Sequence, residues 1–358
     1  MERSEDTSRA DATTGRAPAR PVGDLAPVAR GGPGSAAPVE IGLTAAILSV
    51  ADNEPKVLVV REGEGDAASD GLPSGPFTPL EHRTLEIGLR SSVERQTGLA
   101  LGYVEQLYAF GDRGRHAKPG DIGSHVVSIG YLALTGAVET RSSSNLWQSW
   151  YVYFPWEDRR RGTRGSWLID EVIVPRLLAW AAEPPGENAP QRPIGRQDRV
   201  RMCFATEGTS WDEEKVLERY ELLYEAGLAV EARRDGRPGF DWEGKANPTG
   251  RPMRFDHRRI LATAMGRIRA KIKYRPVIFE LLPDDFTLFE LQRTVEAILG
   301  PHLHKQNFRR LVESGGLVEP TGEVKTATGG RPARLYRFRR EVLLERPAPG
   351  VRVNPGRA

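Results

Sequence analysis

The order of elements between residues 287 and 340 constrains the fold of this chain more than any other feature. Thr287 and Glu290 form a capping box, the pair of side chains that satisfies free N–H groups at the start of a helix. Apolar residues then recur at helical spacing until a Gly-Pro stop at residues 300–301. A second helix is expected over Leu303–Glu313, and short strands over 317–319 and 335–339. Helix, tight turn, helix and hairpin together predict a winged helix-turn-helix.

The second of these helices has two chemically different faces. The residues expected to pack inward are Leu303, Phe308, Leu311 and Val312. Positions four apart share a helix face, so the opposite face carries Lys305, Gln306, Arg309 and Arg310, with Asn307 at the border. Gln reads base edges and Arg reads guanine or phosphate, and this face is therefore predicted to enter a major groove.

Positive charge is concentrated in the same segment. From Gly300 to Arg340 there are nine lysines and arginines against three glutamates, whereas the whole chain has a net charge of only +3. Several of these cations fall on the expected hairpin, where they would contact phosphates beside the groove. The predicted DNA-binding residues are Thr287, Lys305, Gln306, Asn307, Arg309, Arg310, Lys325, Arg331, Arg334 and Arg337. A protein-interaction domain with a solvated basic face is the alternative that the sequence leaves open.

The N-terminal half combines strand and helix signals. The expected strands are Ile41–Val50, Lys56–Arg61, Leu107–Phe110, His125–Leu134 and Trp147–Phe154. The expected helices are Glu81–Gln96, which ends at Gly98, and Ser166–Ala182, which Pro175 should kink. This pattern predicts an α/β domain over residues 38–183.

Residues 184–283 are expected to form a linker and a helical connecting segment. A Pro-rich stretch covers 183–193, and a capping box at Ser210–Glu213 predicts an amphipathic helix to Ala226. Gly, Pro and Arg dominate residues 233–254, which predicts a loop. Asp256 is expected to cap a basic helix over His257–Lys273, a candidate for transmitting domain orientation.

Composition narrows the class of protein. No stretch approaches the roughly 20 consecutive apolar residues of a membrane span, so no membrane contact is expected. Cys203 is the single cysteine, which excludes an internal disulfide and fits a cytoplasmic location. Residues 1–37 and 346–358 lack periodicity and are predicted to be disordered tails, the first without the apolar core of a secretory signal.

Residues 75–99 resemble a Nudix box that has lost its metal-binding residues. In that family glutamates hold magnesium on a diphosphate, because hard divalent ions take oxygen ligands. With Gly98 and Leu99 aligned to the end of the box, the core glutamate positions hold Ser92, Arg95 and Gln96. The other replacements are Phe77 for a glycine, Arg83 for the upstream glutamate and Ser91 for the arginine. A Nudix-like fold without metal or hydrolysis is therefore predicted, and an unorthodox cluster of Glu81, Glu86 and Glu94 is the alternative.

Further motifs resemble those of the Nudix-related transcriptional regulators of NAD metabolism, the NrtR group. They are Tyr274-Arg275-Pro276, Leu281-Leu282-Pro283, Phe286-Thr287-Leu288, Asn307-Phe308-Arg309-Arg310 and Gly330-Arg331-Pro332-Ala333. The extra helical segment around Trp211–Val230 resembles the NadQ-type regulators of alphaproteobacteria. The resemblance implies a degenerate Nudix-like mixed-sheet α/β/α domain followed by a winged helix-turn-helix at residues 284–345. It also implies a homodimeric repressor of NAD biosynthesis or salvage genes that binds double-stranded operator DNA.

The resemblance implies an adenine nucleotide effector, namely NAD, ATP or ADP-ribose, and no cofactor. Arginines bind phosphates through paired N–H groups, and the candidates are Arg83, Arg90, Arg95, Arg113 and Arg115. The inserted segment 192–254 departs from the family pattern and is expected to reshape the effector pocket or the dimer contact. The lost box residues predict that the chain is not an enzyme; the alternative is an active Nudix hydrolase of ADP-ribose or NAD-like diphosphates.

Overall fold

The computed structural model describes ten stretches of the chain. They are residues 39–63, 65, 68–112, 125–136, 144–160, 164–184, 192–242, 247–326, 332–345 and 350–351. The predicted disordered tails lie outside the described residues, except for the last stretch. There the prediction is wrong, because Val351 is buried and its N–H donates to the Ile272 carbonyl at 3.0 Å. No described helix has the length and apolarity that crossing a membrane requires.

A mixed sheet of seven described strands forms the centre of the N-terminal domain. Its strands are β1 (Val39–Ala51), β2 (Glu54–Glu62), β3 (Ser69–Gly71), β4 (Ser74–Pro76), β5 (Tyr103–Phe110), β6 (His125–Leu134) and β7 (Asn145–Ser149). The order is β3-β2-β1-β6-β5, with β4 paired to β1 and β7 to β2. Asp52 and Asn53 both have positive φ, which matches the tight turn between β1 and β2. The β1–β6 pair is parallel, and it makes the sheet mixed.

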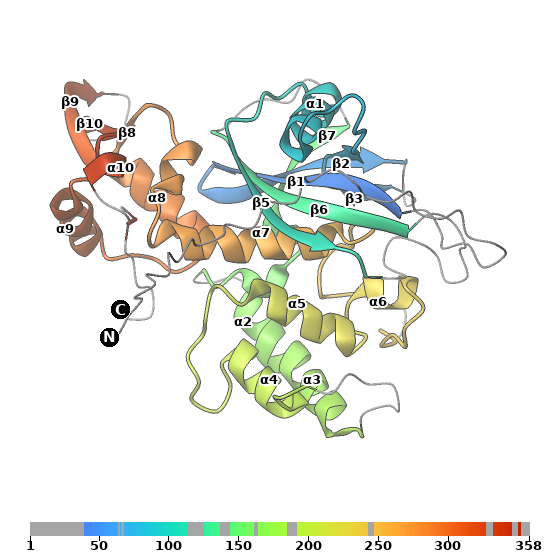
Figure 1. Ribbon diagram of the computed structural model, residues 1–358. Coiled ribbons are helices and arrows are strands. Elements are labelled where there is room, and N and C mark those ends of the chain that lie inside the picture. Colours follow the sequence, from blue (N-terminus) through green and yellow to red (C-terminus); the bar gives the residue numbers. More distant parts are fainter. Residues whose placement is uncertain are drawn as a thin grey trace, which may run out of the picture. The chain divides into compact units, whose positions relative to one another are not determined.

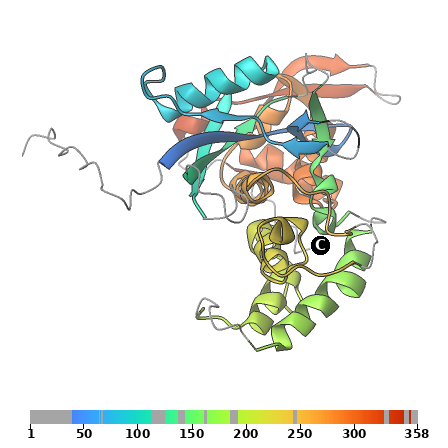
Figure 2. The ribbon, with the colours of Figure 1, turned by 90° about the vertical axis from the view of Figure 1, so that its right-hand side faces the viewer.

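Helices cover both faces of this sheet. Alternate side chains of a strand point to opposite faces, so Leu43 and Ile47 of β1 pack under α1 (Leu85–Thr97), while Ala46 and Leu48 pack toward α7 (His257–Ile272). Figures 1 and 2 show α1 on one side of the sheet and α7 on the other. This is the α/β/α arrangement predicted for the Nudix-like domain, so that part of the fold-class prediction is confirmed.

Several predicted boundaries differ from the structure. Helix α1 begins after Thr84, whose hydroxyl accepts the Ile87 N–H at 3.2 Å, and not at Glu81. The strand expected to reach Phe154 ends at Ser149, and short 3₁₀ turns follow at Trp150–Val152 and Pro155–Glu157. The helix with Pro175 divides into α2 (Gly165–Trp167), a π-helical stretch (Leu168–Ile173) and α3 (Val174–Ala182). Proline has no N–H to donate to the preceding turn, which explains the irregular backbone just before it.

The connecting segment is more helical than predicted. It contains α4 (Arg196–Phe204), α5 (Val216–Glu225) and α6 (Val230–Arg234). Helix α4 escaped prediction because its sequence is strongly polar and only Val200, Cys203 and Phe204 are buried. The predicted capping box at Ser210–Glu213 is wrong, since α5 starts at Val216 and the Asp212 carboxylate accepts the Glu214 N–H instead.

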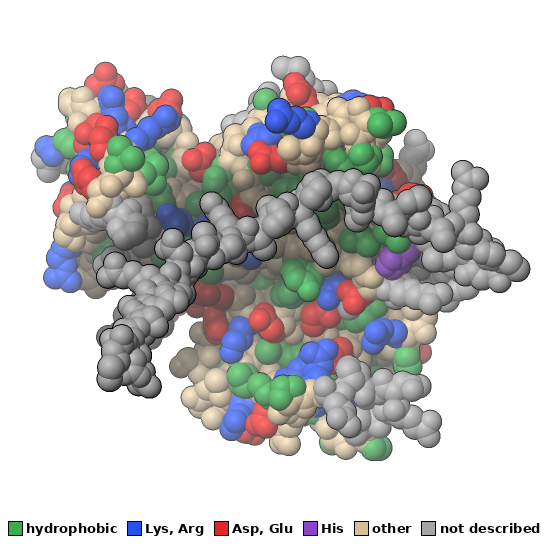
Figure 3. All heavy atoms as spheres, viewed as in Figure 1, with side chains coloured by type: hydrophobic (Ala, Val, Ile, Leu, Met, Phe, Trp, Pro, Cys, Tyr) green, Lys and Arg blue, Asp and Glu red, His purple; other side chains and the backbone are tan. Residues whose placement is uncertain are grey.

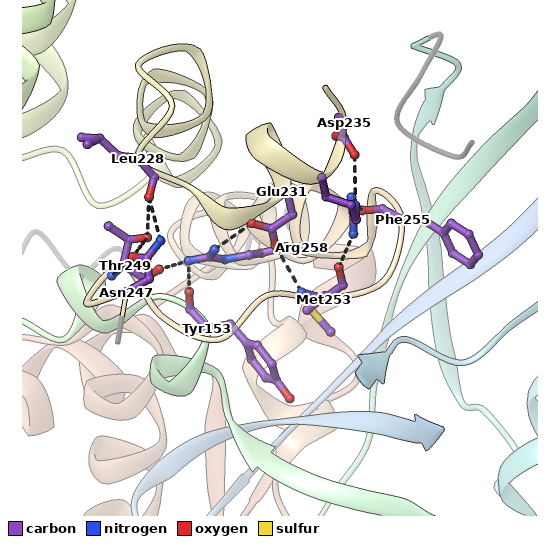
Figure 4. A network of polar contacts seen from close by, with 10 residues as sticks. Tyr153, Leu228, Glu231, Asp235, Asn247, Thr249, Met253, Phe255 and Arg258 are labelled. Atoms are coloured by element: carbon purple, nitrogen blue, oxygen red, sulfur yellow. Dashed lines mark hydrogen bonds and ion pairs between the residues drawn. The ribbon is translucent and has the colours of Figure 1, made fainter. Parts of the chain in front are cut away.

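Arg258 of α7 fixes the Gly- and Pro-rich loop that follows α6. Its fully buried guanidinium pairs with Glu231 at 3.1 Å and also donates to the carbonyls of Tyr153 and Thr249. Figure 4 shows this network, in which Glu231 further accepts the Met253 N–H. A loop rich in Gly and Pro is therefore anchored by a buried arginine of the central helix, and Arg234 of α6 adds hydrogen bonds to the Met253 and Phe255 carbonyls.

The C-terminal domain has the predicted winged helix architecture. It comprises a 3₁₀ turn (Val277–Leu281), β8 (Asp285–Thr287), α8 (Leu288–Leu299), α9 (Lys305–Gly315), β9 (Val318–Lys325), β10 (Ala333–Phe338) and α10 (Val342–Glu345). The predicted capping box is present at Thr287 and Glu290. Strand β8, which was not predicted, pairs with β10 and extends the hairpin to three strands in the order β8-β10-β9. Helix α8 packs against α7 and the β1–β2 strands of the Nudix-like domain.

Candidate functional site

Helix α9 presents a polar face to solvent. Phe308 and Val312 are buried beneath the helix, as the sequence predicts. The exposed residues of α9 include Lys305, Gln306, Asn307, Arg309 and Arg310. Arg309 lies 3.6 Å from Glu313 one turn later, a pair in which both side chains are about half exposed. The predicted base-reading face is thus solvent-accessible.

The turn before α9 is held by two side chains of α8. The Glu296 carboxylate accepts the Leu303 N–H at 2.9 Å, and Gln292 donates to the Leu303 carbonyl at 2.8 Å and to Glu296. Burial alone raises the pKa of Glu296, but these hydrogen bonds and those from His302 and Arg293 outweigh it and leave that pKa lowered. These hydrogen bonds tie the turn before α9 to α8.

The wing consists of β9 and β10. Lys325 pairs with Glu290 at 2.6 Å, and Arg337 lies 3.8 Å from Asp285, so both are partly neutralised. Burial raises the pKa of Glu290, but hydrogen bonds from Lys325 and Thr287 more than offset this and leave it lowered. Arg334 is exposed and forms no ion pair within the described part of the chain. Arg331 lies outside the described residues.

The structure does not support Thr287 as a DNA contact. The residue is only 5% exposed, and its hydroxyl accepts the Glu290 N–H at 3.1 Å and donates to the Glu290 carboxylate at 3.0 Å. Its polar group is used in the capping box, which leaves no hydrogen bond for a phosphate. The sequence signal for Thr287 was structural.

Lys305, Arg310 and Arg334 are three predicted DNA-binding residues whose charge is available to a ligand. Among the described residues, none of the three has a carboxylate within ion-pair distance. Figure 3 shows lysine and arginine side chains along the outer edge of the winged helix domain. Exposed Arg340, just after β10, was not predicted as a site residue although it belongs to the same basic run. The domain thus presents unneutralised cations on both α9 and the wing.

The box helix α1 does not fit the magnesium ion that a Nudix box implies. Ser92 is buried, and Gln96 is committed to strand β4 because its amide pairs with the backbone N–H and carbonyl of Ser74, both at 3.0 Å. Glu86 pairs with Arg90 at 2.8 Å. The described residues include no group of three or more acidic, histidine or cysteine side chains placed to hold a metal. Ser92 and Gln96, which stand at two of the family's ligand positions, therefore have structural roles here.

Among the predicted effector arginines, Arg90 and Arg95 of the described residues lie on different sides of α1. Arg90 is tied down, because it donates to the carbonyls of Leu101 and Gly102 and pairs with Glu86. Arg95 is exposed and lies about 140° around the helix from Arg90, given five residues at 100° each. Arg83 is exposed ahead of α1, and Arg113 and Arg115 lie outside the described residues.

A buried ion network joins the helical segment to the winged helix. The Glu157 carboxylate, fully buried, accepts from Arg219 of α5 at 2.5 Å and from Arg269 of α7 at 2.6 Å. Arg269 also donates to the Ile298 carbonyl near the end of α8 at 3.0 Å. Sequence patterns gave no signal for this network, since its members come from four separate segments.

Comparisons with known proteins match the C-terminal winged helix domain in sequence. Residues 278–338 match the family model of the NrtR DNA-binding winged helix domain. A curated relative, the ADPR responsive transcriptional repressor NtrR of Acinetobacter baylyi, is 45% identical over 86 residues, which are 24% of this chain and 34% of the relative. The match therefore spans about a third of that protein's length.

Solved structures resemble the chain over a longer stretch at lower identity. Shewanella oneidensis NrtR complexed with a 27mer DNA is 21% identical, with a TM-score of 0.49, and the match covers 84% of this chain and 94% of that one. A MutT/nudix family protein from Enterococcus faecalis is 16% identical, with a TM-score of 0.48, over 85% of this chain and 88% of that one. The predicted resemblance to the NrtR-type regulators is confirmed, and the winged helix domain of residues 278–338 carries it.

Proposed function

We propose that this chain is a transcriptional repressor of NAD biosynthesis or salvage genes that binds operator DNA through its winged helix. The observation that carries the proposal is the exposed Lys-Gln-Asn-Arg face of α9 beside an arginine-bearing wing, in a segment that matches a DNA-binding family model. Such a face offers hydrogen bonds to base edges and cations to phosphates. The relative that shares this domain is named a repressor that responds to ADPR.

The N-terminal domain acts in this proposal as a sensor and not as an enzyme. Its box helix has serine, arginine and glutamine at the family's glutamate positions. The effector is an adenine nucleotide, namely NAD, ATP or ADP-ribose, bound without a cofactor. A nucleotide changes operator affinity only as far as it binds the DNA-competent and incompetent arrangements unequally. The active chain is a cytoplasmic homodimer.

Arg310→Ala tests the DNA-binding proposal. Arg310 has no ion pair among the described residues, so its loss should leave folding intact. We expect operator binding to weaken by about 1–3 kcal/mol, with a salt dependence shallower by about one unit. The measurement is a mobility-shift titration on a duplex selected from a random library, with Arg201→Ala, which removes an exposed arginine of α4 outside the winged helix domain, as the matched control. Unchanged affinity in the arginine variant would contradict the proposal.

The same preparation tests the absence of catalysis. Incubation with ADP-ribose or NAD and magnesium is expected to leave the nucleotide intact, as measured by release of phosphate after phosphatase treatment. Magnesium-dependent cleavage would make the chain a hydrolase with an appended DNA-binding domain.

A further inference from the structure

A cavity of about 470 Å³ lies in the helical segment, between α3, α4 and the end of α5. Its volume falls within the roughly 300–1,000 Å³ of small-molecule sites. Its lining includes Arg176, Trp180, Arg196, Glu225, Arg237 and Phe240. Three arginines and two aromatic rings in one cavity are the groups that recognise a phosphorylated aromatic molecule.

The three arginines of the cavity are not neutralised. Arg176 donates to the Val172 carbonyl at 2.9 Å, and Arg196 donates to the carbonyls of Trp180 and Glu183, each at 3.2 Å. None of Arg176, Arg196 and Arg237 has a carboxylate within ion-pair distance in the described ranges. Backbone carbonyls fix a guanidinium without cancelling its charge.

The two acidic residues of the lining do not reverse this balance. Glu225 is already bound by Arg192 at 2.5 Å and by Arg199 at 2.7 Å, so its charge is more than compensated. Glu183 is exposed and forms no described ion pair. The cavity therefore carries net positive charge.

Aromatic rings hold the arginines in position. Arg176 lies over Phe240 at 5.0 Å and Trp242 at 5.1 Å, and Arg196 lies over Trp180 at 4.3 Å. Ring faces orient a cation while leaving its charge for another ligand. The Nε of Arg176 is buried and has no hydrogen-bond partner. Arg237 is likewise positioned by a ring, at 5.1 Å from Tyr224.

We propose that this cavity binds a phosphorylated ligand of nucleotide size, with its phosphates on Arg176, Arg196 and Arg237. Phe240, 40% exposed, offers apolar surface for the rest of the molecule. The proposal rests on the regulator function above and gives its effector a site on the inserted helices in place of the box helix. A multiply charged anion can be attracted by all three guanidiniums that line this cavity.

The cavity has a physical connection to the DNA-binding domain. Its wall includes Glu225, the last residue of α5, and Arg219 on the same helix is bound to Glu157. Glu157 binds Arg269, which donates to the Ile298 carbonyl of α8. A ligand that shifts α5 therefore acts on the helix that precedes the recognition helix.

Calorimetry on the full chain tests the site. The probes are ATP, NAD, ADP-ribose and inorganic triphosphate, titrated into wild type, Arg176→Gln and Arg237→Gln. We expect at least about tenfold weaker binding in both variants, because each loses a charge-assisted hydrogen bond. Arg201→Gln is the matched control, since Arg201 lies on α4 and pairs with Asp198 at 3.1 Å outside the cavity lining. Arg95→Gln on α1 should also bind normally.

Three outcomes would overturn the site. They are wild-type affinity in both cavity variants, loss of binding in Arg95→Gln alone, and no binding of any probe by wild type. Thermal unfolding of each variant shows whether it is folded. If Arg176→Gln is unfolded, the binding affinity of Arg237→Gln still tests the site, because Arg237 is exposed.

Operator binding without nucleotide, measured in the same variants, separates the two proposals. Normal operator binding with a lost nucleotide response supports the site. If wild type binds no selected duplex, the proposed repressor function is overturned. The calorimetry would still show whether the cavity binds a phosphorylated ligand.

Discussion

Glu157 joins two helices through buried ion pairs. Its carboxylate is fully buried and binds Arg219 and Arg269, which reach it from α5 and α7. Burial raises its pKa, but the charges of the two guanidiniums outweigh burial and leave that pKa lowered. A buried ion pair is costly to form and costlier to break, because removing one partner strands the other charge.

Glu157→Gln is expected to lower the free energy of unfolding by about 3–5 kcal/mol, because two buried guanidiniums lose their counter-charge. Chemical denaturation at neutral pH measures this, and Glu280→Gln, an exposed glutamate of the same type, should change little. Loss of less than about 1 kcal/mol would mean that water or another group compensates.

The same residue predicts a pH dependence. The folded pKa of Glu157 lies below its ordinary value of 4.5, so its contribution to stability is fully present above pH 4.5 and declines as pH falls toward the folded pKa. Wild type should therefore lose more stability than Glu157→Gln between pH 5 and lower values. Parallel stability curves for the two proteins would contradict this assignment.

At the scale of elements, the α8–α9 turn decides how the recognition helix is presented. Its geometry comes from Glu296 and Gln292, which bind the backbone of Leu303, and not from the turn sequence alone. The box helix α1 is the opposite case. Gln96 occupies a family ligand position, yet its amide hydrogen-bonds the backbone of Ser74 and so ties α1 to β4.

Glu296→Ala is expected to weaken operator binding although the residue is 6% exposed. The Leu303 N–H loses its acceptor, which costs about 1–3 kcal/mol, and the start of α9 becomes free to tilt. Mobility shift and thermal unfolding measured together check this. An unchanged melting temperature and unchanged DNA affinity would show that the conformation of the turn does not depend on Glu296.

At the scale of the whole molecule, the proposed homodimer sets the form of the operator. Two recognition helices related by twofold symmetry meet half-sites about one helical turn apart, or a multiple of it. We expect two molecules per selected duplex in analytical ultracentrifugation and an inverted repeat in the protected sequence. One molecule on an asymmetric site would contradict the dimer.

The sequence by itself determined the elements whose signals are local. The capping box at Thr287, the stop at Gly98 and the run of apolar and β-branched residues in β1 depend on neighbours within a few residues, so pattern alone placed these elements. It also gives the residue types at the Nudix-box positions, because a motif is a matter of residue types at known spacing.

Only the tertiary structure decided which arginines are available. Arg90 and Arg95 are both arginines of the box helix, and the sequence does not distinguish them. In the structure Arg90 donates to a backbone carbonyl, whereas Arg95 is exposed. Arg176 and Arg237 lie 61 positions apart and line the same cavity, which no local sequence pattern predicts. The reason is that charge neutralisation and burial depend on contacts between distant segments, whereas helix caps and strand periodicity depend on the chain's nearest neighbours.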